Sequence, residues 1–376
     1  IDHIGRLPDL VHNGFCGEII CSHPSKALLG PLLEDALGFT EYSYRQKQKI
    51  LEDIDKLSYG FEFNDQFFLK KGIRFKLGRA GHILGSCFIR FELSENYSLV
   101  FSGDLGSKHT PILCDPDISE PCDLLVLEST YGDRLHEERK QRVERLSQVL
   151  TQALADGGKV FIPAFALGRT QELIYELDRL DIAQKRDFPV YLDSPLGLEL
   201  TRIYHKLSPF WDQEAKSLYK KGDHPLDFDN LYAVGNYEQH WQLVDTPGPM
   251  IILAGSGMCT GGRIVNHLDS GLEDKRNDLL FVGYQANGTP GRDILRYADK
   301  PDGYVFLDGH KKSIKANIEQ LSGYSAHADQ KGLLEWVQAM GDMPEEIHLV
   351  HGEYTAKQGL KLALRELGVD KQRIVD

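Results

Sequence analysis

Short apolar runs alternate along most of the chain with stretches in which apolar residues recur every third or fourth position. The runs are typical of buried strands, and the helical spacing is typical of amphipathic helices. Their alternation predicts a layered α/β fold. We expect strands at the following residues: 98–102, 123–128, 159–163, 188–192, 250–254, 278–282, 314–321 and 346–350.

Helical spacing is clearest between residues 136 and 156, where four apolar side chains share one face: Val143, Leu146, Leu150 and Leu154. Two glycines then supply a stop signal. Further helices are expected near residues 170–180, 332–340 and 355–367. The strands and helices between residues 159 and 282 predict a separate parallel-sheet insert within the chain.

Composition narrows the class of protein. The chain has 376 residues, of which 41% are hydrophobic and 26% charged, which allows two globular domains. A formal charge of −13 argues against non-specific coating of nucleic acid, although it leaves room for a local basic groove. No apolar run approaches the ~18 residues of a membrane helix. Six cysteines without a C-x-x-C pair favour a reducing, cytoplasmic setting.

Five polar residues lie at the ends of apolar strands or in glycine-flanked turns: His82, Asp104, Glu128, His327 and His351. Imidazoles and carboxylates are the ligands that suit Zn²⁺, and glycine lets the backbone fold closely around a metal. One histidine alone is usually structural, so it is the combination that predicts a metal site. The other histidines, His240 and His267 among them, have no motif and are expected to be structural or exposed.

The chain begins with a second metal-binding signal. Ile1-Asp2-His3 matches the end of an H-x-H-x-D-H motif, so we expect two more histidines before residue 1. We also expect a further strand after Asp376, and therefore a longer protein. Without those parts the chain should bind metal poorly.

Together, these segments resemble the β-CASP branch of the metallo-β-lactamase superfamily over essentially the whole chain and in the same order. The resemblance implies an αββα sandwich that holds two zinc ions at its edge, with an inserted α/β β-CASP cap domain built on a parallel sheet. It assigns residues 1–133 and 313–376 to the metallo-β-lactamase domain and residues 134–312 to the β-CASP domain.

The resemblance also implies roles for individual residues. The zinc ligands would be Asp2, His3, His82, His351 and Asp104, the last of which bridges both ions. Glu128 would orient His327, the general acid. A histidine at position 351 is typical of RNA-processing members, whereas DNA-processing members have an aliphatic residue there.

A glycine-rich segment, residues 254–263, lies between a predicted strand and a predicted helix, where backbone N–H groups can bind an anion. A tight turn is the simpler interpretation. The resemblance implies RNA contacts in this segment and in residues 283–292, namely Ser256, Gly257, Met258, Gln285, Thr289 and Arg292. Arg169, at a predicted helix start, could pair with a phosphate or with a neighbouring carboxylate.

The sequence therefore predicts a zinc-dependent hydrolase that cleaves single-stranded RNA by two-metal attack, leaving a 5′-phosphate and a 3′-hydroxyl. We expect an endoribonuclease more than a 5′ exoribonuclease, working as a homodimer or in an RNA-processing complex and away from membranes. Two alternatives stay open: a non-catalytic β-CASP scaffold subunit, which zinc content would distinguish, and a small-ester metallohydrolase.

Overall fold

The computed structural model describes residues 3–94, 97–137, 139–180 and 188–375. The chain divides into two compact units. The first comprises Ile1–Leu135, Leu207–Asp212 and His327–Asp376, and the second comprises His136–Lys206 and Gln213–Ala326.

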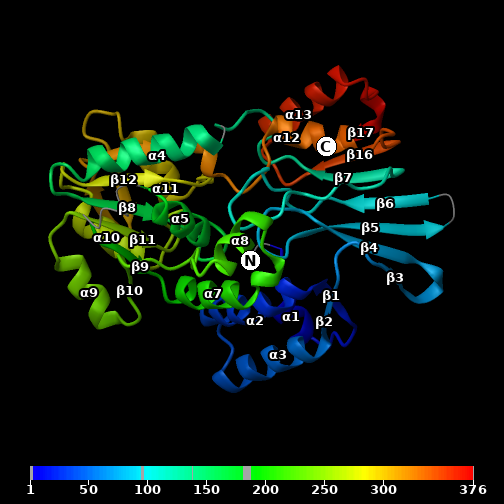
Figure 1. Cartoon of the computed structure of the whole chain (residues 1–376), viewed down its shortest axis with the longest axis horizontal. Coiled ribbons are helices and arrows are strands. Elements are labelled where there is room, and N and C mark those ends of the chain that lie inside the picture. Colours follow the sequence, from blue (N-terminus) through cyan, green and yellow to red (C-terminus); the bar gives the residue numbers. More distant parts are fainter. Residues whose placement is uncertain (1–2, 95–96, 138, 181–187, 376) are drawn as a thin grey trace. The chain divides into compact units, whose positions relative to one another are not determined.

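The first unit combines a large sheet with helices from both ends of the chain (Figure 1). Its helices are α1 (Leu7–His12), α2 (His23–Gly38), α3 (Tyr44–Leu57), η1 (Lys70–Gly72), η2 (Ser208–Phe210), α12 (Gln330–Ala339), α13 (Tyr354–Glu366) and η4 (Lys371–Arg373). Its strands are β1 (Ile19–Ser22), β2 (Ser58–Phe61), β3 (Gln66–Phe68), β4 (Arg74–Arg79), β5 (Cys87–Ser94), β6 (Tyr97–Phe101), β7 (Leu124–Glu128), β16 (Glu346–Val350) and β17 (Ile374–Val375).

Seven of these strands form one mixed sheet in the order β17-β16-β7-β6-β5-β4-β3. Neighbours from β17 to β6 pair in parallel, whereas β6, β5, β4 and β3 pair antiparallel. Since β4 and β6 both run antiparallel to β5, the strands β4, β6, β7 and β16 all end at the same edge. Strands β1 and β2 form a small parallel sheet of their own.

Apolar side chains of α12 and α13 pack on one face of the seven-stranded sheet. Leu333 and Val337 of α12 and Leu360 of α13 share a buried cluster with Leu125 and Leu127 of β7. A second cluster joins α1, α2 and α3 through side chains that include Leu33 and Ile50. The burial on α12 explains its apolar spacing in the sequence, since helical positions three and four apart face the same side.

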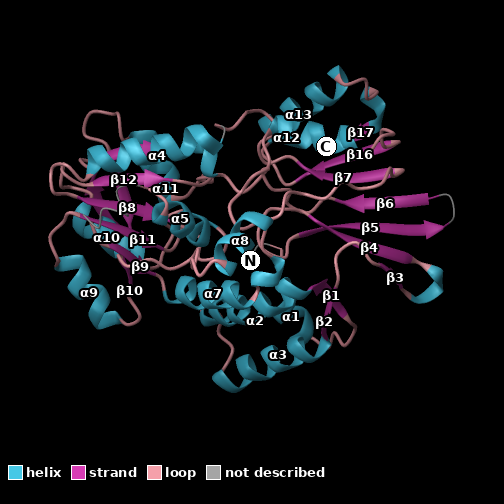
Figure 2. Cartoon of the chain, in the orientation of Figure 1, coloured by secondary structure: helices cyan, strands magenta, loops and turns pink. Residues whose placement is uncertain are grey.

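The second unit is built on a different sheet (Figure 2). Its helices are α4 (Arg139–Ala153), α5 (Arg169–Asp178), α7 (Pro195–Lys206), α8 (Gln213–Lys220), α9 (Tyr237–Asp245), α10 (Arg263–Gly271), α11 (Pro290–Tyr297) and η3 (Ser322–Tyr324). Its strands are β8 (Lys159–Pro163), β9 (Val190–Asp193), β10 (Leu231–Ala233), β11 (Met250–Ala254), β12 (Asp278–Phe281), β13 (Tyr304–Leu307), β14 (His310–Ser313) and β15 (Asn317–Gln320).

Six of the strands form an all-parallel sheet in the order β10-β9-β11-β8-β12-β15. Parallel sheets are covered on both faces, which is why β11 and β12 are buried along their whole length. Helices α10 and α11 and strand β13 pack in one core with β8, β11 and β12. Helix α4 contacts β8, and helix α7 contacts β9.

The predicted strands and the parallel sheet of the insert are confirmed, with ends that differ by a few residues. The predicted boundary at residues 312/313 differs from the division seen in the structure. Strand β15 follows that boundary, yet it pairs with β12 and so completes the sheet of the second unit. Apolar patterning could not show this, because a short run does not reveal its pairing partner. No helix among the described residues is long and apolar enough to cross a membrane.

Candidate metal centre

Strand ends gather the polar residues of the first unit at one edge of its sheet. Asp104 follows β6, Glu128 ends β7 and His351 follows β16, and these three strands are parallel neighbours. His82 follows β4, which ends at the same edge. Residues far apart in the sequence therefore meet because the strands that carry them end together.

Asp104 lies at the centre of three imidazoles. Its Oδ2 atom is 3.0 Å from His3 Nε2 and 3.8 Å from His82 Nε2. Its Oδ1 atom is 3.3 Å from His351 Nδ1. Two groups able to hold a metal ion share this carboxylate, one with His3 and His351 and the other with His82 and His327. A carboxylate common to two such groups is placed as a bridging ligand would be.

The state of Asp104 also fits a cation. Its Oδ1 atom is buried and accepts no hydrogen bond from the described residues, although buried acceptors are normally satisfied. Burial by itself would raise the pKa of this carboxyl, but a hydrogen bond from His3 and the charges of the surrounding imidazoles lower that pKa to about 2. The group is therefore an ionised carboxylate with an unused acceptor, surrounded by nitrogen donors that suit Zn²⁺.

His327 is held by Glu128. Its Nδ1 atom lies 3.2 Å and 3.1 Å from the two carboxylate oxygens of Glu128. The Glu128 side chain is buried and also accepts a hydrogen bond of 2.6 Å from the Leu105 N–H. The ring of His327 lies 4.3 Å from that of His82 and 5.4 Å from that of His351, measured between centroids. A carboxylate-held imidazole thus borders the ligand cluster.

Close backbone contacts lock the loops of the centre together. Gly106 forms a bridge with His327, and a Cβ atom at Gly106 would lie 1.9 Å from the carbonyl oxygen of Gly81. Any residue larger than glycine would push these loops apart. The Ser107 hydroxyl donates to the carbonyl of His327 at 2.9 Å.

The sequence analysis did not predict a role for Thr130 at the metal centre. Its hydroxyl lies 3.0 Å from Nδ1 and 2.9 Å from the carbonyl oxygen of His351, whose φ of 51° is unusual for a residue other than glycine. This contact can fix the ring and the backbone of His351 together. The only available signal was its position two residues after Glu128 in the same motif.

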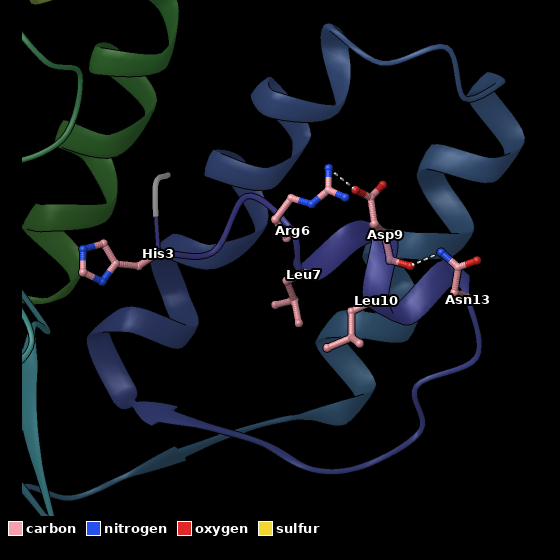
Figure 3. A pocket seen from close by; sticks show the side chains of 6 residues that line it. All are labelled: His3, Arg6, Leu7, Asp9, Leu10 and Asn13. Carbon is pink, nitrogen blue, oxygen red and sulfur yellow. Dashed lines mark hydrogen bonds and ion pairs between the residues drawn. The ribbon is translucent and has the colours of Figure 1, made fainter. Parts of the chain in front are cut away.

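A pocket at α1 is lined by His3, Arg6, Leu7, Asp9, Leu10 and Asn13 (Figure 3). In that pocket Arg6 pairs with Asp9 at 3.0 Å, and the Asn13 side chain donates to the Asp9 carbonyl at 2.7 Å. The His3 ring lies apart from these residues, and its side chain is 51% exposed. Asp2, predicted as a ligand, lies outside the described residues.

In the second unit, the predicted RNA contacts lie at the carboxyl ends of parallel strands. Ser256, Gly257 and Met258 follow β11, and the backbone N–H groups of Gly257 and Met258 donate to no atom in the described part of the chain. Gln285, after β12, is buried and donates to the Gly257 carbonyl at 2.8 Å, so it supports this loop. In open α/β sheets, ligands bind at this edge.

Helix α11 begins beside the same loop. Its N-cap is Thr289, whose hydroxyl accepts from the Arg292 N–H at 3.3 Å and donates to the Ala286 carbonyl at 2.7 Å. The Gly291 N–H donates to the Met258 carbonyl at 3.1 Å. Thr289 therefore has a structural role in capping, while the Arg292 side chain is exposed.

Of the two partners expected for Arg169, the structure contains a carboxylate, and contact with a phosphate stays a prediction. Arg169 is buried and its guanidinium pairs with Glu172, three residues later. Glu172 also pairs with Arg142 at 2.9 Å, and Arg142 pairs with Glu176 at 3.1 Å. Arg142 further donates to the Gly323 carbonyl at 2.7 Å. Arg169 thus belongs to a buried charge network.

A second Asp–His cluster lies at the end of β9 and was not predicted. Asp193 Oδ2 is 2.6 Å from His240 Nδ1 and 2.7 Å from His267 Nε2, and its Oδ1 is 2.6 Å from the Arg263 guanidinium. Burial would raise the pKa of Asp193, but hydrogen bonds from these three side chains hold that pKa below its ordinary value. Burial lowers the pKa of His267. His240 and His267 are completely enclosed, as expected of structural histidines.

Comparison with known proteins identifies the family. Residues 170–294 match the Beta-Casp domain, and residues 311–373 match the Zn-dependent metallo-hydrolase RNA specificity domain. Ribonuclease TTHA0252 of Thermus thermophilus is 36% identical over 94% of this chain and 79% of its own length. Transcription termination factor FttA is 31% identical in Methanocaldococcus jannaschii and 32% in Pyrococcus abyssi, in each case over 94% of this chain.

This chain belongs to the β-CASP family of the metallo-β-lactamase superfamily. It spans 57% and 56% of the two archaeal relatives, just over half of their length. The predicted fold class, a metallo-β-lactamase fold with an inserted β-CASP domain, is confirmed, as is membership of a family of metal-dependent hydrolases. The roles of individual β-CASP residues stay predictions.

Proposed function

We propose that the chain carries the catalytic centre of a zinc-dependent ribonuclease that hydrolyses single-stranded RNA to a 5′-phosphate and a 3′-hydroxyl. The observation that carries this proposal is the convergence of Asp104, three imidazoles and the His327–Glu128 pair at one sheet edge. The names of two relatives, a ribonuclease and a transcription termination factor, support RNA as the substrate class.

We assign two zinc ions to this centre, held by His3, His82, His351 and the shared carboxylate of Asp104, with Asp2 as a further ligand. When bound there, two divalent ions would supply activation of water and stabilisation of negative charge on a phosphodiester. The ionised Asp104 would supply negative charge to both cations, and its Oδ1 atom, which accepts no hydrogen bond from the described residues, supports this role.

His327 has the placement of a general acid. Glu128 is buried and accepts a hydrogen bond from Nδ1, which fixes the orientation of the ring and assigns proton transfer to Nε2. The departing 3′ oxygen of RNA needs a proton because an alkoxide is a poor leaving group. Glu128 positions the ring and His327 transfers the proton.

RNA contacts are assigned to the glycine-rich loop and the start of α11. The N–H groups of Gly257 and Met258 and the hydroxyl of Ser256 offer donors to a phosphate, and the exposed Arg292 adds a positive charge. Gln285 and Thr289 hold this region in shape through their own hydrogen bonds.

We place the activity in the cytoplasm, in a homodimer or an RNA-processing complex.

The test uses the whole protein with RNA and DNA oligonucleotides of the same sequence, together with measurement of bound zinc. We expect close to two zinc ions per chain and cleavage of single-stranded RNA in preference to DNA, with internal cuts before terminal ones. Absence of bound metal, or a clear DNA preference, contradicts the proposal. Bound RNA without cleavage would favour the non-catalytic scaffold.

A further inference from the structure

The β13–β14 hairpin carries large aromatic rings on its outer face. Along β13, Val305 and Leu307 are buried in the core of the second unit, whereas Tyr304 and Phe306 are 42% and 56% exposed. Side chains of a strand alternate between faces, so the inner face fills the core and the outer face is aromatic. Packing of this hairpin explains the aliphatic residues and gives no reason for two exposed rings.

The exposed rings form one cluster with a third ring from α11. Tyr297 lies parallel to Tyr304, with ring centroids 6.5 Å apart and planes 5° apart. Phe306 meets Tyr304 edge-on at 5.7 Å. Cations accompany the rings: the Arg296 guanidinium lies 5.4 Å from the centroid of Tyr297, and Lys311 Nζ lies 4.0 Å from that of Tyr304. We call these five residues the aromatic platform.

The surroundings of the aromatic platform are basic in an acidic chain. Residues 290–316 contain six Lys and Arg and four Asp, so their formal charge is 6 − 4 = +2, whereas the whole chain carries −13. A local excess of cations beside exposed rings suits a polyanion with flat bases. A protein partner would require no such combination of charge and aromatic surface.

Helix α11 joins the aromatic platform to the proposed phosphate contacts. Thr289 and Arg292 lie at its start, beside Met258 of the glycine-rich loop, and Tyr297 is its last residue. Arg292 and Arg296 are four positions apart and so lie on the same side of the helix. Both arginines are exposed, so two cations lie on the helix that runs from the loop to the rings.

We propose that the aromatic platform binds a second stretch of the single-stranded RNA whose phosphate contacts the glycine-rich loop. Bases stack on Tyr304, Phe306 and Tyr297, while Arg296 and Lys311 contact phosphates. The ligand class rests on the proposed ribonuclease function. Stacking is tolerant of sequence, so this surface adds affinity and a length requirement without base preference.

The test measures binding of oligouridylates of increasing length to the whole protein, by fluorescence anisotropy under conditions without cleavage. The double variant Tyr304→Ala/Phe306→Ala should bind long RNA roughly tenfold or more weakly per lost ring, from the strength of base stacking, and the shortest RNA like the wild type. Tyr232→Ala is the matched control, because Tyr232 is a similarly exposed ring (47%) on β10 of the same unit.

Two further measurements keep the result interpretable. Phe306→Trp retains a stacking surface and should keep wild-type affinity, and Lys311→Gln should reduce the salt dependence of binding. Equal affinity of double variant and wild type at every length overturns the proposal, as does an equal loss in Tyr232→Ala. A changed oligomeric state with unchanged RNA affinity also overturns it, in favour of a contact between chains. Binding is read without cleavage, so failure of the ribonuclease proposal would show separately as wild-type protein that binds RNA and does not cut it.

Discussion

Two clusters in this chain contain an aspartate and histidines. They differ in the distances between these side chains, in their exposure to solvent and in whether an arginine pairs with the aspartate. Around Asp104 the imidazole nitrogens stand 3.0, 3.8 and 3.3 Å from the carboxylate, and His3 and His351 are 51% and 37% exposed. Around Asp193 the nitrogens stand 2.6 and 2.7 Å away, all three side chains are completely enclosed, and Arg263 already supplies a positive charge.

Both clusters contain residue types that could hold a metal ion, so the distinction between them rests on spacing and charge. Atoms bound to one zinc ion at about 2.0–2.2 Å cannot approach each other as closely as hydrogen-bonded atoms do. The spacing around Asp193 is that of hydrogen bonds, and its carboxylate is neutralised by the protein itself. Around Asp104, His3 lies at hydrogen-bond distance, but His82 and His351 stand 3.8 and 3.3 Å away and the Oδ1 atom accepts no hydrogen bond from the described residues. We therefore expect replacement of Asp104 to reduce RNA cleavage and zinc binding. Replacement of Asp193 should instead reduce the stability of the fold.

The largest effect is expected from Asp104→Ala. Loss of the shared carboxylate should abolish RNA cleavage and reduce bound zinc, with only a modest loss of stability if the remaining ligands hold one ion. Cleavage rate, zinc content and the unfolding midpoint are measured together. Asp342→Ala, at an exposed position of the same unit, is the control. A variant that cleaves at near the wild-type rate would show that the Asp104 cluster is not the centre.

His327→Ala tests the general acid. Cleavage should slow by about 10²–10⁴-fold, the usual contribution of a general acid, while zinc content and RNA affinity stay unchanged. An RNA whose 3′ oxygen at the scissile bond is replaced by sulfur needs little protonation, so the variant should recover much of its deficit on that substrate. An equal defect on both substrates, or the loss of a zinc ion, would make His327 a ligand or a positioning residue.

Asp193→Asn tests the enclosed cluster. Removal of one partner from a buried ion pair leaves Arg263 uncompensated and should cost about 3–5 kcal/mol of stability, seen as a lower denaturant midpoint. Zinc content should equal that of the wild type. Asp274→Asn is the control, since its ion pair with Arg276 is exposed to solvent and should contribute little to stability. A lower zinc content in Asp193→Asn than in the wild type would show that the Asp193 cluster also binds metal.

Only one of the two clusters could be predicted from the sequence. Residues 159–163 and 250–254 were predicted as strands because their apolar runs follow from burial, and Asp104, Glu128 and His351 were predicted as a site because each ends such a run. The enclosed cluster was not predicted, since Asp193, His240 and His267 lie on separate elements and only the fold brings them together. The pairing of β15 and the partner of Arg169 were hidden for the same reason.

The buried network of Arg142 has a consequence for how the catalytic centre forms during folding. The Glu128–His327 pair joins residues 199 positions apart, and closing a flexible loop of that length costs about 5 kcal/mol in chain entropy. Arg142, near the start of the second unit, donates to Gly323 near its end, 181 positions later. A second unit that folds first would leave only short linkers to close and would reduce this cost by about 2 kcal/mol. A second unit that folds first would thus act as a pre-closed loop between Glu128 and His327.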